Sequence, residues 1–341
     1  MKKDEIIDFE QLWDPGYKCA CTVGWKPSVK SFMLNQFERT LNMEERLKDG
    51  TWKNGRPKPI VIYYPKKREG LSIQFPDRVY QRSINDLALY PTMVRSFIYD
   101  NSACQKGKGP DFTIERLKRS LHNYVMKYGL DGWVTQFDVH GYYPSMGHHM
   151  VKEIFREQLD EDIYVMVTDV LDQQYEGDVG YNPGSQMVQI AGISTLNRLD
   201  HMCKEELHME NYRRYMDDGL NIGLDREREE HNLKRIVDQL KRQGFQTNPN
   251  ETHVIPLRDG FKFLGWDWKV TDTGKVIMTL DSQNIHHERK RLYRMARKVK
   301  RGDATREKAD ECYDAWKSYA SKGNTYKVIQ RMDAYYKDLW R

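Results

Sequence analysis

Two adjacent carboxylates stand in the most informative stretch of the sequence. Tyr215–Asp218 reads Tyr-Met-Asp-Asp and lies between two short runs of β-type residues, which predicts a hairpin with both aspartates at its tip. Neighbouring carboxylates repel each other unless a cation lies between them. An Asp-Gly pair is also common in ordinary hairpin turns, so Asp217, Asp218 and Gly219 alone do not decide between a metal site and a turn.

A third carboxylate favours the metal site. Trp133–Phe137 has the alternation of a β-strand, and Asp138 follows it directly. Three carboxylates from two neighbouring strand ends can hold two Mg²⁺ ions roughly 3.5–4 Å apart, the arrangement used for in-line transfer of a nucleotide. Mg²⁺ prefers carboxylate oxygens and substrate phosphates, and Mn²⁺ accepts the same ligands. These residues therefore predict a two-metal nucleotidyl transferase.

The elements that must position these carboxylates alternate between helices and short strands. Hydrophobic periodicity predicts a mostly helical start up to about Asp49, and Pro91 must interrupt or bend a later helix. Further helices are expected at about 78–99, 112–127, 148–173, 185–208, 226–243 and from 285 onward. Strands are expected at 59–64, 71–75, 133–137, on both sides of 215–218, and within 262–266. This order predicts an α+β fold.

Composition excludes several classes of protein. The 341 residues are 39% hydrophobic, enough to fill a core, and give room for two ordinary domains or one large enzyme. Mean hydropathy is −0.83, and no apolar run approaches the roughly 18 residues of a membrane span. The five cysteines form no paired CxxC, and the polar start is unlike a signal peptide. We expect a reduced cytoplasmic protein without a membrane partner.

A basic stripe near the C-terminus predicts contact with nucleic acid. The net charge of +5 says little by itself. Positions 286–301, however, hold eight cations and a single acid, Glu288, with Tyr293 among them. A helix would place four of the cations on one face, as a phosphate-tracking surface requires. These four are Lys290, Arg294, Arg297 and Arg301.

In this order, the motifs resemble those of reverse transcriptases from the bacterial, group II intron-like branch. The resemblance runs from about Gly24 to the C-terminus. The segments that carry it are 66–69 with 77–81 (fingers), 138–146 (motif A), 184–200 (motif B), 215–218 (motif C), 263–266 (after motif D) and 316–326 (thumb). It implies a right-hand polymerase with fingers, an antiparallel-sheet palm and a short helical thumb. The implied boundaries are 1–130 for the N-terminal region and fingers, 131–284 for the palm with fingers helices at about 148–180, and 285–341 for the thumb.

The resemblance also implies roles for individual residues. Asp138, with the Val139 carbonyl, and Asp217 would be the principal Mg²⁺ ligands, and Asp218 the third carboxylate. Tyr143 would be the steric gate, an aromatic ring where a ribose 2′-OH would clash, although a core aromatic explains it equally well. The implied nucleotide-binding residues are Lys67, Arg68, Tyr143, Pro183, Gly184 and Gln189. The implied template–primer contacts are Arg78, Tyr215, Met216, Lys290, Arg294, Arg297 and Arg301.

Two motifs depart from the family pattern. Pro183 replaces the usual Gln of motif B. Gln189 stands where many relatives have Pro, and this Gln, like Met216, resembles the enzymes of diversity-generating retroelements. This motivates the hypothesis of low fidelity. In motif D, Glu251 occupies the position of a lysine presumed to protonate pyrophosphate, and His253 either replaces that lysine or is an ordinary strand histidine.

The sequence therefore predicts an RNA-directed DNA polymerase that copies an RNA template from a DNA or RNA primer with dNTPs. A diversity-generating retroelement enzyme would work with a small basic accessory protein and a structured RNA. The alternative is a phage-defence reverse transcriptase with an associated non-coding RNA. An RNA-dependent RNA polymerase and a non-catalytic RNA-binding scaffold are the readings from other classes.

Overall fold

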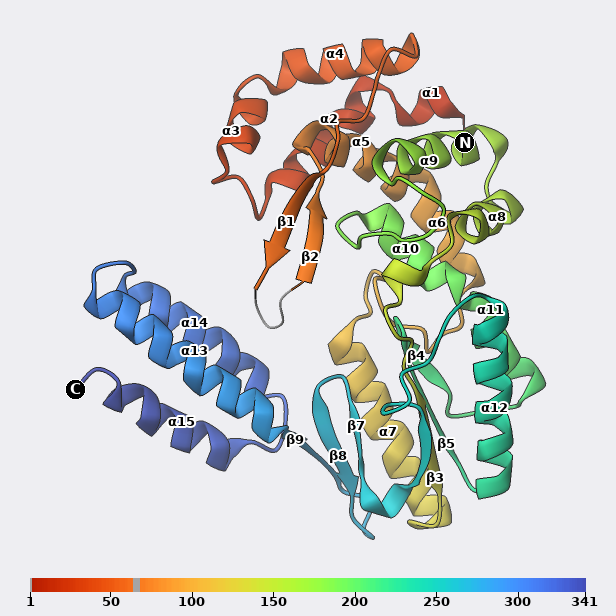
Figure 1. Cartoon of the computed structure of the whole chain (residues 1–341), viewed down its shortest axis with the longest axis vertical. Helices are drawn as coiled ribbons and strands as arrows, with labels where there is room; N and C mark the ends of the chain where they lie inside the picture. Colours follow the sequence, from red (N-terminus) through yellow and green to blue (C-terminus); the bar gives the residue numbers. More distant parts are fainter. Residues whose placement is uncertain (1, 64–67) are drawn as a thin grey trace. The chain divides into compact units, whose positions relative to one another are not determined.

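The computed structural model describes residues 2–63 and 68–341 (Figure 1). The chain forms two compact units. The first comprises Met1–Gly109, Phe137–Gly219 and Asn232–Thr252, and the second comprises Pro110–Gln136, Leu220–His231 and His253–Arg341. Strands β3 and β5 and helix α12 continue from one unit into the other.

Helices make up most of the first unit, as predicted for its N-terminal part. Asp8 caps α2 by accepting a hydrogen bond from the Glu10 N–H, and Pro27 begins α3, where a missing N–H costs nothing. The helices are α1 (Lys3–Ile6), α2 (Phe9–Ala20), α3 (Pro27–Leu34), α4 (Gln36–Lys48), α5 (Phe75–Ile84), α6 (Tyr90–Met93), α8 (His148–Gln158), α9 (Glu161–Gln174), α10 (Gln186–Thr195) and α11 (Asn197–His201).

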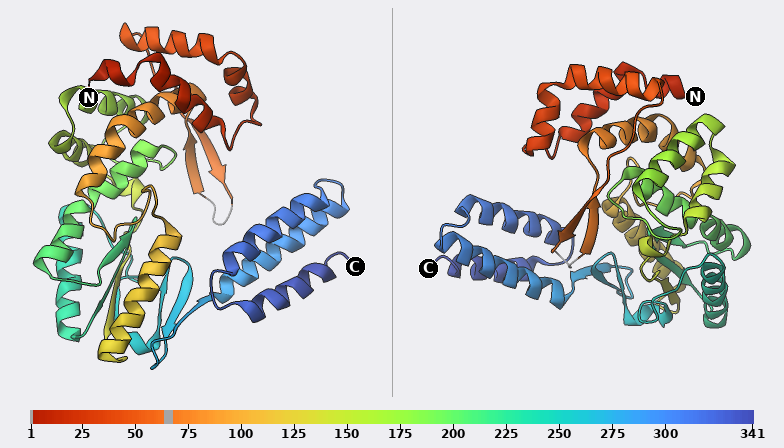
Figure 2. Two further views of the ribbon diagram at one scale, coloured as in Figure 1. Left: turned by 180° about the vertical axis from the view of Figure 1, so that it is seen from behind. Right: turned by 45° about the horizontal axis from the view of Figure 1, so that its top comes forward.

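A two-stranded hairpin extends from these helices. Its strands β1 (Lys58–Ile62) and β2 (Arg68–Ser72) pair antiparallel, and Figure 2 shows them side by side. The prediction of a strand over 71–75 is wrong in its second half, because Phe75 already begins α5. Pro76 fits the first turn of a helix, where no N–H is needed.

Pro91 interrupts the next helical stretch as predicted, through a local change of helix type. A π-helical turn, η1 (Asn85–Leu89), links α5 to α6, and Pro91 lies in the first turn of α6. Buried polar side chains then connect α5 to two later helices. Ser185 donates to the Gln81 side chain (2.7 Å), which donates to Gln174 (2.8 Å).

The central sheet explains how distant motifs meet. Its strands lie in the order β4 (Arg213–Tyr215), β5 (Asp218–Gly223), β3 (Trp133–Phe137) and β6 (His253–Pro256). The predicted strand at 133–137 and the predicted hairpin around 215–218 are both confirmed. Strand β3 lies between β5 and β6, so the end of β3 adjoins the start of both neighbours.

The second unit adds a smaller sheet and further helices. Strands β7 (Phe261–Phe263), β8 (Trp266–Val270) and β9 (Val276–Leu280) pair antiparallel, with Trp266 and Trp268 buried. The helices are α7 (Pro110–Tyr128), α13 (Ser282–Lys300), α14 (Arg306–Ala320) and α15 (Tyr326–Asp338), together with the first residues of α12 (Arg226–Arg242), most of which belongs to the first unit. No helix in the described part of the chain is both long enough and apolar enough to cross a membrane.

Candidate metal centre and nucleic-acid contacts

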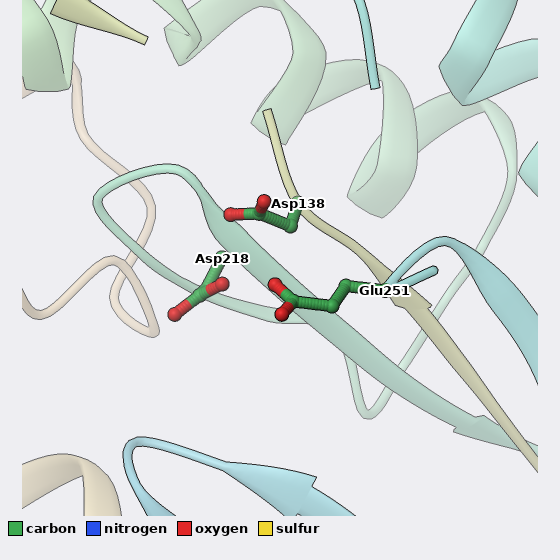
Figure 3. A group of neighbouring side chains, drawn as sticks. All are labelled: Asp138, Asp218 and Glu251. Atoms are coloured by element: carbon green, nitrogen blue, oxygen red, sulfur yellow. The ribbon is translucent and has the colours of Figure 1, made fainter. Parts of the chain in front are cut away.

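Three carboxylates converge in the first unit. Asp138 follows β3, Asp218 begins β5, and Glu251 lies in the loop before β6. One oxygen from each carboxyl group lies within 4.8 Å of the other two. Figure 3 shows the three carboxyl groups facing a common space. The structure thus brings Asp138 and Asp218 together as predicted from the sequence.

A glycine allows β5 to approach β3 this closely. A Cβ at Gly219 would lie 2.1 Å from ring atoms of Phe137, so no side chain fits between the strands. The backbone of Asp138 is held from the other side, because its carbonyl accepts the Asn248 N–H (2.9 Å) and its N–H donates to the Thr252 hydroxyl (3.4 Å). Both aspartates are therefore fixed by backbone packing.

The carboxylates destabilise one another electrostatically. Burial, followed by the negative charges of Asp217 and Asp138, raises the pKa of Asp218 from 3.8 to about 8. A divalent cation among the three groups would offset both the repulsion and the loss of hydration. Three carboxylates that are half-buried or exposed match the oxygen ligands of Mg²⁺ or Mn²⁺, so the residues present fit such an ion.

Asp217 lies at the tip of the hairpin, next to the three-carboxylate group. It lies with Met216 in the two-residue turn between β4 and β5, and it is not part of the three-carboxylate group. Its charge raises the pKa of Asp218 and also contributes to the raised pKa of the Tyr142 and Tyr143 hydroxyls. The expectation that Asp138 and Asp217 are the principal ligands, with the Val139 carbonyl, stays a prediction. Val139 itself is buried, and its backbone forms an isolated antiparallel β-bridge with Thr247.

Glu251 is the member of the group that the sequence did not assign to metal. Strand β3 pairs with β6 so that Gln136 lies opposite His253. Two residues beyond this pair lie Asp138, just after β3, and Glu251, just before β6. The antiparallel register of β3 and β6 would therefore have identified Glu251 as a neighbour of Asp138, but that register was not predicted. His253, the alternative in motif D, begins β6.

Tyr143 lies against the turn that carries the aspartates. Its hydroxyl is 3.8 Å from the Met216 sulfur, and a Cβ at Gly192 would come within 3.1 Å of that hydroxyl. Burial raises the pKa of the half-buried Tyr143 well above its ordinary value. Tyr215 ends β4 and is half-buried as well. These contacts place Tyr143 against the turn that carries Asp217, and its role as a steric gate stays a prediction.

The motif B residues lie between β2 and α10. Pro183 and Gly184 are exposed, and a Cβ at Gly184 would lie 2.7 Å from the Leu71 carbonyl oxygen. Only glycine therefore permits this approach to β2. The Gln189 amide donates to the Pro183 carbonyl (3.5 Å), and Gln189 also lines a cavity of about 270 Å³ together with Lys106.

Both residues predicted to bind the triphosphate, Lys67 and Arg68, lie wholly or partly outside the described residues. Lys67 lies outside the described residues, and of Arg68 only the backbone, which begins β2, is described.

Arg78, which was predicted to contact the template–primer, is half-buried and lines a cavity of about 380 Å³ with three further cations, Lys26, Arg39 and Lys58. None of the described residues lining this cavity carries a carboxylate, a composition that suits an anion.

The basic stripe forms one exposed face of α13, as predicted. Lys290, Arg294 and Arg297 are exposed, and Arg301, at the end of the helix, pairs with Asp303 (3.2 Å). The opposite side of the helix carries the buried residues Glu288, Leu292 and Ala296. Contact with a phosphate backbone stays a prediction for this face.

Comparison with known proteins gives a likeness in structure alone. No family model matches the sequence, and no curated protein matches it. The structure is similar to that of telomerase from Candida albicans in complex with a TWJ fragment of telomeric RNA, with a TM-score of 0.52 and 12% identity over 73% of this chain and 50% of that chain. Apo telomerase from Candida tropicalis, truncated from its C-terminal domain, gives a TM-score of 0.47 and 15% identity over 65% of this chain and 55% of that chain.

The first likeness is one of fold alone, and the expected α+β class is confirmed by the observed helices and antiparallel sheets. This chain spans half the length of that telomerase chain. The boundaries of fingers, palm and thumb, and the group II intron-like branch, stay predictions.

Proposed function

We propose that this protein is an RNA-directed DNA polymerase. The observation that carries the proposal is the convergence of Asp138, Asp218 and Glu251 within 4.8 Å in a chain with a reverse transcriptase-like fold. Telomerase, the protein with the similar structure, was determined with RNA. An RNA template, a DNA or RNA primer and dNTPs are the substrates that follow from this proposal.

The carboxylates would act as ligands for divalent cations. Asp138 and Asp218 supply oxygens from two adjacent strands, Glu251 supplies a third, and Asp217 is close enough to raise the pKa of Asp218. Bound Mg²⁺ lowers the pKa of an attacking 3′-hydroxyl and neutralises charge on the triphosphate. The rigid backbone around Gly219 and Asp138 would keep these oxygens in place between catalytic cycles.

Tyr143 would select deoxynucleotides. Its hydroxyl contacts the Met216 sulfur, and Gly192 leaves room for its ring because a Cβ there would come within 3.1 Å of the hydroxyl. This distinguishes the proposal from an RNA-dependent RNA polymerase. We expect Tyr143→Ala to raise incorporation of ribonucleotides relative to deoxynucleotides at least tenfold, whereas Tyr143→Phe keeps the preference of the parent.

Within this class we favour an enzyme of a diversity-generating retroelement over a phage-defence reverse transcriptase. The support is Gln189, which stands where many relatives have Pro, together with Met216 in the turn; Pro183, where relatives carry Gln, motivates the hypothesis of low fidelity. A small basic accessory protein and a structured RNA are the partners that go with it. Sequencing of products copied from a defined RNA tests the choice, because frequent errors at template adenines are expected and an ordinary low rate would contradict it.

Primer extension on an RNA template tests the proposed activity. The parent protein should extend a DNA primer with dNTPs and Mg²⁺, and EDTA should stop it. Asp138→Asn should lower the rate at least a thousandfold. The matched control is Asp272→Asn, which removes an exposed carboxylate from a turn and should change nothing. Equal rates for the parent and Asp138→Asn would refute the proposal.

A further inference from the structure

A fully buried ion pair lies beneath the turn that carries Asp217. The side chains of Arg214 and Asp200 have no exposed surface. Arg214 Nε donates to one oxygen of Asp200 (2.7 Å) and Nη2 donates to the other (2.6 Å), which is the bidentate geometry of an arginine–carboxylate pair. Arg214 belongs to β4 and Asp200 to α11, so the pair links the hairpin of motif C to the helix at the end of motif B.

The remaining donors of Arg214 reach backbone carbonyls in two places. Nη2 donates to the Ile193 carbonyl in α10 (2.9 Å), and Nη1 donates to the Met216 carbonyl in the turn (2.5 Å). Asp200 is completed by the Tyr212 hydroxyl (2.9 Å) and the Asn101 amide (3.3 Å). One guanidinium therefore joins α10, α11 and the turn.

The turn needs such support because of its backbone conformation. Met216 has a φ of 56°, in the left-handed region that disfavours residues with a Cβ. Asn and Asp tolerate this region through local side-chain hydrogen bonds, and Met has none to offer. The hydrogen bond from Arg214 to the Met216 carbonyl is a restraint on the residue that immediately precedes Asp217.

Stability does not explain why the pair is charged. Burial alone would lower the pKa of Arg214, but the carboxylate of Asp200 more than compensates and keeps the guanidinium charged. A buried ion pair is often no more stabilising than apolar side chains of the same volume, because both charges lose their hydration. An apolar pair could not donate a hydrogen bond to the turn, whereas Arg214 does. A role in positioning the turn therefore explains the charged pair better than stability does.

We propose that Arg214 and Asp200 are positioning residues: they hold the Met216 carbonyl and thereby set where Asp217 and Asp218 stand relative to Asp138. The effect of Arg214 and Asp200 on the position of the turn does not depend on what the protein catalyses. Its consequence for metal binding and catalysis rests on the proposed function.

The test replaces the charged pair by apolar side chains in the whole chain of 341 residues. The variant is Arg214→Met/Asp200→Leu, and the matched control is Lys152→Met/Asp172→Leu, which removes another ion pair of the first unit (2.6 Å) that is partly exposed. Three readouts apply: the melting temperature, the ¹³C-methyl resonance of Met216 assigned with Met216→Leu, and the dissociation constant for Mn²⁺. The Met216 methyl reports the turn because its sulfur contacts the Tyr143 hydroxyl.

We expect the Arg214→Met/Asp200→Leu variant to melt within a few degrees of the parent, with a shifted and broadened Met216 resonance and at least tenfold weaker Mn²⁺ binding. In primer extension, kcat should fall at least tenfold while KM for the template–primer stays within twofold. The Lys152→Met/Asp172→Leu control should match the parent in every readout.

Two outcomes would overturn the proposal: an unchanged Met216 resonance in the folded double variant, or a shifted resonance with Mn²⁺ affinity and kcat at parent values. Should the double variant not fold, Arg214→Lys answers the same question. It keeps a charge opposite Asp200 but cannot bond both carboxylate oxygens and the Met216 carbonyl, so the same losses are expected. A parent that binds no Mn²⁺ would refute the proposed function, while the resonance would still decide the position of the turn.

Discussion

At the scale of single residues, the candidate metal centre depends on which carboxylate of the Asp-Asp pair faces Asp138. The three-carboxylate group contains Asp218, and Asp217 lies in the turn beside Met216, whose backbone is left-handed. The sequence predicted that both aspartates would be close to Asp138. It could not predict the choice between them, since a methionine gives no sign of a positive φ.

The raised pKa of Asp218 predicts how divalent cations affect stability. In the folded protein this carboxyl group holds its proton up to about pH 8, whereas its ordinary pKa is 3.8. Between these values the folded state binds the extra proton, so the contribution of Asp218 to stability is present at low pH and is lost as the pH rises. A cation replaces the proton, and its stabilising effect should grow over the same range.

We therefore expect saturating Mn²⁺ to raise the melting temperature more at pH 8 than at pH 5. Differential scanning fluorimetry across this range measures it. Asp218→Asn should show little Mn²⁺ effect at either pH, and Asp272→Asn should behave as the parent. A shift that is equal at both pH values in the parent would argue against metal binding by these carboxylates.

At the scale of elements, strand β3 and the β4–β5 hairpin were predictable, and the pairing of β3 with β6 was not. Alternation marked β3, and the Tyr-Met-Asp-Asp stretch marked the β4–β5 hairpin. From the sequence, Glu251 matched the position of the usual motif D lysine and was not assigned to metal. Its place near Asp138 depends on the pairing of β6 with β3, and β3 lies more than a hundred residues earlier in the chain. Register between such distant strands follows from the packing of the whole sheet and is not written in local periodicity.

Helix α13 is the element for which nucleic-acid binding can be measured directly. Its cations Arg294 and Arg297 are exposed on one face. If each contacts a phosphate, Arg294→Gln/Arg297→Gln should weaken binding of an RNA–DNA duplex and lower the slope of log K against log salt by about 2. Fluorescence anisotropy between 50 and 300 mM salt, roughly the range in which such binding is sensitive, measures both.

The matched control for α13 is Lys308→Gln/Lys337→Gln, which removes two exposed cations from α14 and α15. It should leave the slope within 0.5, by the order-of-magnitude rule of about one unit per contact. Equal slopes for the α13 variant and the parent would show that this face is only solvated.

At the scale of the whole molecule, burial of single charges couples folding to pH. Asp77 is buried at the start of α5, where it accepts the Gly55 N–H (3.0 Å). Burial raises the pKa of Asp77 to about 7, although the hydrogen bond from Gly55 lowers it. The folded state thus binds a proton that the unfolded state has released, and stability from this group falls as the pH rises from about 4 to 7.

Asp77→Asn keeps the acceptor for Gly55 without a charge. The variant should lack a pH dependence of up to about 1.4 kcal/mol per pH unit that the parent shows over this range. It should therefore be more stable than the parent at pH 8 and gain nothing at pH 4. Urea denaturation followed by circular dichroism provides the free energies, and parallel pH profiles for the two proteins would rule out a buried, protonated Asp77.

The pairing of β3 with β6 sets a rule for the length of the chain around Glu251. Glu251 closes the turn that precedes β6: its N–H donates to the Asn248 carbonyl (3.1 Å), and the Asn248 N–H donates to the Asp138 carbonyl (2.9 Å). One short turn therefore returns the chain beside Asp138 and also supplies a carboxylate to the cluster. Residues inserted between Asn248 and Glu251 would break the hydrogen bond between them and carry the acid away from Asp138, so this loop tolerates changes of composition better than changes of length.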